Sequence, residues 1–142
     1  MKDLSLEEYR ALAEFRYQIR RFLCFSEERV RAAGMEPQQH QLLLAVKGLP
    51  DGAIATIGEL AERLQLKHHS TVELVNRLEK LGYVTRESGQ RDRRQVVVHL
   101  SHSGATVLRK LSLAHHQELE NAGPRLAKAL RSIARQQGAN AA

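Results

Sequence analysis

The sequence contains little of what several common protein classes require. Its 142 residues include no tryptophan, and aromatic residues make up only 4%. Proteins that bind single strands or looped RNA stack bases on aromatic rings, so this scarcity disfavours that class. Cys24 is the single cysteine, which excludes an intrachain disulfide and a cysteine-based zinc cluster. We expect Cys24 to be a small buried residue on a helix.

Long apolar runs and the common catalytic motifs are also missing. No stretch approaches the roughly 18 consecutive apolar residues that span a bilayer, and the N-terminal segment has no apolar signal-peptide core. We therefore expect a cytoplasmic protein without membrane contact. The sequence has no Gly-x-Ser-x-Gly elbow, no phosphate-binding glycine loop and no Glu-x-x-His pair, which argues against an enzyme.

The seven histidines raise the question of a metal site. Two adjacent pairs, His68-His69 and His115-His116, are poor chelators, because neighbouring side chains on a helix point in different directions. We expect these histidines to be polar surface residues, and we expect no bound metal or cofactor.

Positive charge is what the sequence has in excess. The formal net charge is +6 and the sequence pI is about 9.9. Such a surplus suits a polyanionic partner, although a solvated basic surface is also common. Because base-stacking side chains are scarce, duplex DNA is the expected polyanion.

Hydrophobic spacing and capping residues predict a mainly α-helical chain. Ser5 and Glu8 form a capping-box pattern at the start of a long helix that ends near Gly34. Long apolar stripes at both ends of the chain exceed what a small domain needs for its own core, so we expect them to pair two copies. The alternative is packing within one chain. Later helices are predicted over residues 37–48, 56–64, 68–82, 105–122 and 125–137, with Gly123-Pro124 as a break before the last.

Two of these helices outline a helix-turn-helix, because only Gln65, Leu66 and Lys67 separate them. The second helix places Thr71, Leu74, Val75, Leu78 and Leu81 in one apolar sector, with polar side chains nearly opposite. A polar face is ordinarily just solvated. Here, however, the helix starts with poor helix formers whose side chains can hydrogen-bond base edges in a major groove. The expected DNA contacts on this helix are His68, His69, Ser70, Thr71, Glu73, Asn76, Arg77 and Lys80.

A β-hairpin is predicted directly after the helix-turn-helix, in the position called a wing. Two β-type runs, 83–87 and 95–100, flank the polar stretch SGQRDRR. A charged turn can be merely solvated, but an extended hairpin can also deliver arginine into the electronegative minor groove. The expected DNA contacts at this tip are Arg91, Asp92, Arg93 and Arg94.

The segment from about residue 53 to 104 resembles the winged-helix domain of MarR-type transcriptional regulators. That family carries an Asp-x-Arg signature in the wing, matched by Asp92-Arg93-Arg94. It also has a Leu-Ser/Thr-x-x-Gly entry to the next helix, matched by the sequence from Leu100 to Gly104. The resemblance implies that Arg94 enters the minor groove. It also implies that Asp92 reaches a basic residue of the helix that reads the DNA, here the helix predicted over 68–82. The candidate for that residue is Arg77.

The fold implied by the resemblance is a mainly α winged helix-turn-helix with a β-hairpin wing and terminal dimerisation helices. We expect one domain over 1–142, with DNA binding in 53–103 and dimerisation through 1–35 and 104–137. The expected partners are a second copy, a pseudo-palindromic operator in double-stranded DNA, and a small organic effector that relieves repression. A metal- or redox-responsive regulator of the same fold, and a winged-helix protein-interaction module, are the alternatives.

Overall fold

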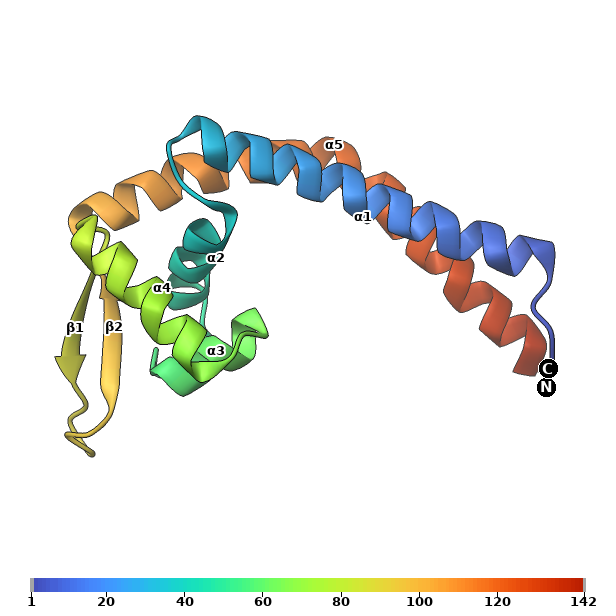
Figure 1. Ribbon diagram of the computed structural model, residues 1–142. Coiled ribbons are helices and arrows are strands. Elements are labelled where there is room, and N and C mark those ends of the chain that lie inside the picture. The colour runs from blue at the N-terminus through green and yellow to red at the C-terminus, as the bar shows by residue number, and fades with distance from the viewer. Residues whose placement is uncertain (1, 142) are drawn as a thin grey trace. The chain divides into compact units, whose positions relative to one another are not determined.

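A computed structural model describes residues 2–141, with side chains described for residues 2–135. Contacts divide the chain into two compact units: Val30–Ser112, and the segments up to Arg29 and from Leu113 onward. The chain is mainly helical with one antiparallel hairpin, as predicted (Figure 1). The elements are α1 (Leu6–Ala32), α2 (Pro37–Lys47), α3 (Ile57–Leu64), α4 (His68–Lys80), β1 (Val84–Ser88), β2 (Val96–Leu100) and α5 (His102–Ala141).

The unit Val30–Ser112 has its own hydrophobic core. Every helix and strand within this unit contributes to it, so burial of apolar surface fixes the helix-turn-helix and the base of the hairpin together. The α3–α4 pair lies beside α2, and the hairpin extends from the C-terminal end of α4 (Figure 1). The fully buried side chains of this core are Val30, Leu42, Leu43, Leu60, Val75, Leu78, Val84 and Val98, with Thr71 among them.

Local signals in the sequence set the helix boundaries. Pro37 opens α2, and Glu36 and Gln39 form a reciprocal capping box there. The hydroxyl of Thr56 accepts a hydrogen bond from the amide of Glu59 at the start of α3. Beyond α4, Gly82 takes a φ of 80°, the left-handed conformation predicted for the end of this helix.

The hairpin pairs β1 with β2 in a register from Val84 opposite Leu100 to Ser88 opposite Val96. The sequence did not reveal that a third segment adds to this sheet. The amide of Val98 donates to the carbonyl of Ala55, and a single bridge joins Thr56 to Val97. The wing is therefore anchored to the segment that leads into α3.

The base of the wing closes through the Leu-Ser-x-x-Gly segment. The hydroxyls of Ser101 and Ser103 donate to the carbonyl oxygen of Gly82, at 2.6 Å and 2.8 Å. At Gly104, a Cβ atom would overlap the carbonyl oxygen of Tyr83. Glycine is needed at this position because the first turn of α5 lies directly against the backbone that joins α4 to β1.

The other unit consists of parts of α1 and α5. The predicted capping box is present, since Ser5 and Glu8 exchange hydrogen bonds at the start of α1. The ring of His115 lies 2.7 Å from the hydroxyl of Ser26 and makes edge contacts with Phe22 and Phe25. These contacts place α1 and α5 side by side in this unit.

The predicted break at Gly123-Pro124 is wrong, because α5 continues through Pro124 without interruption. Proline in a helix interior loses one hydrogen bond and crowds the preceding turn, at a cost of ~3 kcal/mol. Ala122 and Ala129 are buried on either side of this point. Packing on both sides therefore holds the helix together across the proline.

Three burial predictions are also wrong. His40 is buried rather than on the surface. Cys24 is exposed rather than buried, because it lies about 200° around α1 from Phe22 and Ser26, which face α5. Leu81 is 56% exposed, although it was assigned to the apolar sector of α4. It is the cap residue just beyond Lys80, where α4 ends, and the helical periodicity that predicts its burial does not extend past the helix. Among the described residues, no helix is long and apolar enough to cross a membrane.

Candidate nucleic-acid interface

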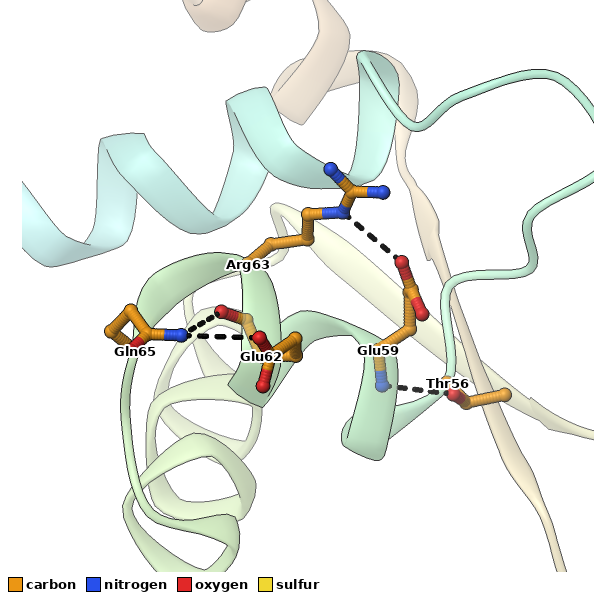
Figure 2. A network of polar contacts seen from close by, with 5 residues as sticks. All are labelled: Thr56, Glu59, Glu62, Arg63 and Gln65. Atoms are coloured by element: carbon orange, nitrogen blue, oxygen red, sulfur yellow. Dashed lines mark hydrogen bonds and ion pairs between the residues drawn. The ribbon is translucent and has the colours of Figure 1, made fainter.

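The turn between α3 and α4 is fixed by hydrogen bonds within it (Figure 2). Gln65 adopts a φ of 53°, a left-handed conformation that is uncommon outside glycine. Its side-chain amide donates to the carbonyl of Glu62 at 2.8 Å and to the Glu62 carboxylate at 3.3 Å. Arg63 pairs with Glu59 at 3.1 Å on the same short helix. The Gln65 contacts therefore hold the left-handed residue that ends α3, and the Arg63–Glu59 pair lies within α3 itself.

The structure places most of the predicted α4 residues on one accessible face. His68, His69, Glu73, Arg77 and Lys80 are exposed, and Ser70 is half-buried. The first turn of α4 contains no acidic residue that would repel a negatively charged partner. This face therefore offers hydrogen-bonding groups near the start of the helix and cationic side chains near its end.

Asn76 is only half-exposed, which the sequence did not predict. Its Oδ1 atom is buried and has no hydrogen-bond partner within the described part of the chain. A bidentate contact with adenine uses both the oxygen and the nitrogen of the amide. Asn76 can make that contact only if the side chain rotates away from the helix surface.

The expected contact of Thr71 with DNA does not fit its position. Thr71 is 0% exposed, and its hydroxyl donates to the carbonyl of Lys67 at 3.0 Å. The 100° spacing that puts this residue in the apolar sector also turns it away from any ligand on the outer face. Thr71 contributes to the core and to the first turn of α4.

The wing tip presents its arginines to solvent. Arg91, Arg93 and Arg94 are exposed, and the Arg94 side chain is 93% accessible. One carboxylate oxygen of Asp92 accepts from the amide of Arg94 at 3.0 Å and lies 3.4 Å from its Nε. Gly89 closes the turn, since a Cβ there would lie 2.7 Å from the carbonyl oxygen of Asp92. The contacts of Asp92 with Arg94 therefore set the conformation of the tip.

The expected bridge between Asp92 and Arg77 is not among the contacts of the described residues, because Asp92 is turned toward Arg94. A different ion pair joins the wing to α4. The Nε and Nη2 atoms of Arg86 donate to the two carboxylate oxygens of Glu79, each at 3.2 Å. Sequence reasoning missed this pair. Alternation along β1 was the available signal, since it puts Arg86 on the same face as the buried Val84.

The histidines do not gather into a metal site. Within the described residues, no group of three histidine, cysteine, aspartate or glutamate side chains lies close enough together to hold a metal ion. His99 pairs with Glu87 at 3.0 Å across the hairpin, and His116 lies 3.4 Å from Glu120 on α5.

Residues 33–95 match the model of the MarR family. The uncharacterized HTH-type transcriptional regulator YcgE of Bacillus subtilis (strain 168) is 36% identical over 91 residues, which cover 64% of this chain and 57% of YcgE. The part of the chain from residue 33 to 95 therefore resembles the MarR family. YfiV, a second uncharacterized HTH-type regulator of the same organism, is 32% identical over 84 residues, which cover 59% of this chain and 50% of YfiV.

The MarR family consists of transcriptional regulators and not of enzymes. The match spans about half the length of the two curated relatives. Solved structures cover the chain more fully. AbsC, a MarR family transcriptional regulator from Streptomyces coelicolor, has a TM-score of 0.74 at 20% identity, over 98% of this chain and 99% of AbsC. Sco3205, a MarR family regulator of the same organism in complex with DNA, has a TM-score of 0.73 at 25% identity, over 97% and 89%.

Proposed function

We propose that this protein is a regulator of the MarR type that binds duplex DNA sequence-specifically in the cytoplasm. One observation carries the proposal: the polar face of α4 and the arginines of the wing tip are exposed together on one compact unit. An α-helix fits the major groove, and an arginine-bearing hairpin fits the adjacent minor groove. Sco3205, whose fold is similar to that of this chain, forms a complex with DNA.

Each exposed polar side chain then has a role that follows from its position. His69, Ser70 and Asn76 lie on the part of α4 suited to base edges, together with His68 and Glu73. The positively charged Arg77 and Lys80 are suited to phosphates. At the tip, Arg94 is proposed to enter the minor groove. Arg91 and Arg93 are placed to meet phosphates, and Asp92 holds the turn that presents Arg94.

We propose that two copies assemble through α1 and α5. The unit formed by these helices leaves large apolar side chains in solvent, more than scattered surface residues would explain. A homodimer with a two-fold axis would bury the same surface on both subunits and place two recognition helices on one operator. The exposed apolar residues are Leu6, Tyr9, Leu12, Tyr17, Leu23, Leu113, Leu119 and Leu130.

Repression relieved by a small organic molecule is the proposed mode of regulation. DNA binding by BpsR of Bordetella bronchiseptica, which has a similar fold, is regulated by 6-hydroxynicotinic acid. For this chain, the test is whether a candidate organic acid lowers the affinity for operator DNA at fixed salt. Unchanged affinity across a panel of such acids would leave the DNA-binding proposal intact and overturn the effector proposal.

DNA binding itself is tested by titrating the protein against labelled duplex DNA over a range of salt concentrations. We expect the observed binding constant to fall steeply with salt, because each phosphate contact releases counterions. Replacing Arg91, Arg93 and Arg94 together with alanine should weaken binding and flatten the salt dependence. The matched control replaces the exposed Lys47, Arg109 and Lys110, which changes the net charge equally.

Equal losses from the tip variant and the control would show that general charge, rather than the wing, binds the DNA. Failure of the wild-type protein to bind duplex DNA in moderate salt would favour the protein-interaction module.

A further inference from the structure

We propose that the Glu79–Arg86 ion pair positions the wing, setting its angle to α4 so that helix and hairpin engage DNA together. This inference rests on the proposed function, since it concerns the same surface. Glu79 lies in the last turn of α4 and Arg86 in the middle of β1. Each side chain is a little over one-third exposed, with Arg86 at 38% and Glu79 at 39%.

The register of the hairpin shows why Arg86 can reach α4. Arg86 pairs with Val98, and the next pair on the same face, two residues away, is Val84 with Leu100. Val84 and Val98 are both buried in the core. Arg86 therefore leaves the strand on its inner face, where the last turn of α4 lies within reach.

The geometry of the contact suits a positioning role. Two parallel N–H to oxygen bonds of 3.2 Å join the guanidinium to both carboxylate oxygens. Such a fork fixes orientation as well as distance. A partly exposed ion pair contributes little to folding stability. Its main effect is therefore expected on the direction of the wing rather than on the stability of the unit.

The other hydrogen bonds at the junction of α4 and β1 lie at the hairpin's base: the Tyr83 amide donates to Leu78, and two serine hydroxyls donate to the Gly82 carbonyl. The second strand is held separately, by the contacts of Val97 and Val98 with the segment before α3, and these do not involve α4. Arg86 is two residues farther along β1 than Val84, or about 6–7 Å closer to the tip. A contact farther from the base resists rotation of the hairpin more effectively.

The direction in which Glu79→Gln changes the affinity for DNA tests the proposal. Removing a negative charge from the surface should by itself tighten binding to a polyanion. If the pair positions the wing, Glu79→Gln should instead weaken binding by about tenfold, with a melting temperature close to wild type. The probe is the duplex that wild-type protein selects from a random pool. The matched control is Glu87→Gln, which removes the same charge from the other face of β1 and should bind at least as tightly as wild type.

Two further readouts separate positioning from general damage. Reversing the pair with Glu79→Arg and Arg86→Glu together should recover most of the affinity lost in Glu79→Gln, at unchanged net charge. Adding Arg94→Ala should cost less in the Glu79→Gln protein than in wild type, because the tip is already displaced.

Wild-type affinity or tighter binding in Glu79→Gln overturns this inference alone, as does strict additivity with Arg94→Ala. A wild-type protein that binds no duplex overturns the proposed function and this inference with it.

Discussion

At the scale of single residues, Asp92 is the least expected member of the proposed interface, because a carboxylate beside DNA is repelled by phosphates. Its contacts explain its presence. By accepting from the amide of Arg94, it closes a turn over residues 92–94 and holds the tip arginine. The tip is therefore an ordered turn rather than a cluster of independent charges.

This role predicts different outcomes for two substitutions of Asp92. Asp92→Asn keeps the oxygen that accepts from Arg94 and removes the charge, so it should bind operator DNA as tightly as wild type or more tightly. Asp92→Ala removes the acceptor and should bind more weakly despite its more positive charge. Affinities measured at one fixed salt concentration test this pair. Tighter binding by both variants would show that Asp92 only repels the DNA phosphates and that its hydrogen bond to Arg94 does not help binding.

Arg94 should account for about one phosphate-equivalent contact. Arg94→Ala is expected to weaken binding and to lower the slope of log affinity against log salt by about one unit. Titrations at several salt concentrations measure this slope. An unchanged slope would mean that Arg94 remains solvated in the complex.

Base discrimination should depend on the outer face of α4. His69→Ala and Asn76→Ala are each expected to cost on the order of 1–3 kcal/mol of discrimination, provided that the side chain reaches a base edge. Competition between the selected duplex and a scrambled duplex measures the loss. His69→Ala should leave thermal stability unchanged because His69 is exposed. A loss confined to thermal stability would instead assign these residues to the fold.

At the scale of elements, the junction between α4, β1 and α5 decides where the wing begins. Gly104→Ala should destabilise the protein by about 1–3 kcal/mol, because the added Cβ would overlap the carbonyl of Tyr83. Gly58→Ala is the matched control, since it also lies in the first turn of a helix and its Cβ would meet nothing. It should stabilise by about 0.5–1 kcal/mol. Thermal unfolding measures the change in stability of both variants. Equal changes would show that the overlap with the Tyr83 carbonyl does not matter.

Helix α5 supplies a second test at this scale. Pro124→Ala should restore a helical hydrogen bond and stabilise the protein by about 2 kcal/mol. This is the ~3 kcal/mol cost of an interior proline less ~1 kcal/mol for the greater freedom of the unfolded chain. Chemical denaturation measures the change. Destabilisation instead would show that the packing of α5 against α1 requires the local geometry that proline imposes.

The elements were predictable from the sequence wherever a local signal decided them. Capping patterns at Ser5 and Thr56 and the glycine at position 82 placed helix ends correctly. Pro124 misled the prediction because tertiary packing outweighs a local preference. The Glu79–Arg86 pair was missed because it depends on how far the hairpin leans toward α4, and alternation alone does not give that angle.

At the scale of the whole molecule, the central claim is that two copies present two winged helices to one duplex. Exposed apolar side chains on α1 and α5 support the pairing of copies, and the similarity of residues 33–95 to the MarR family model supports the regulatory role. A two-fold axis in the protein requires a matching symmetry in the operator. The symmetry of the bound site therefore reports on the assembly as well as on recognition.

The most direct measurement is selection of bound sequences from a pool of random duplexes with wild-type protein, followed by the stoichiometry of the complex on the recovered site. We predict an inverted repeat whose half-sites are about 10 bp apart, or a multiple of that spacing, bound by two chains. Recovery of a single asymmetric site bound by one chain would contradict the dimeric account. A pool that shows no enrichment would contradict sequence-specific DNA binding itself.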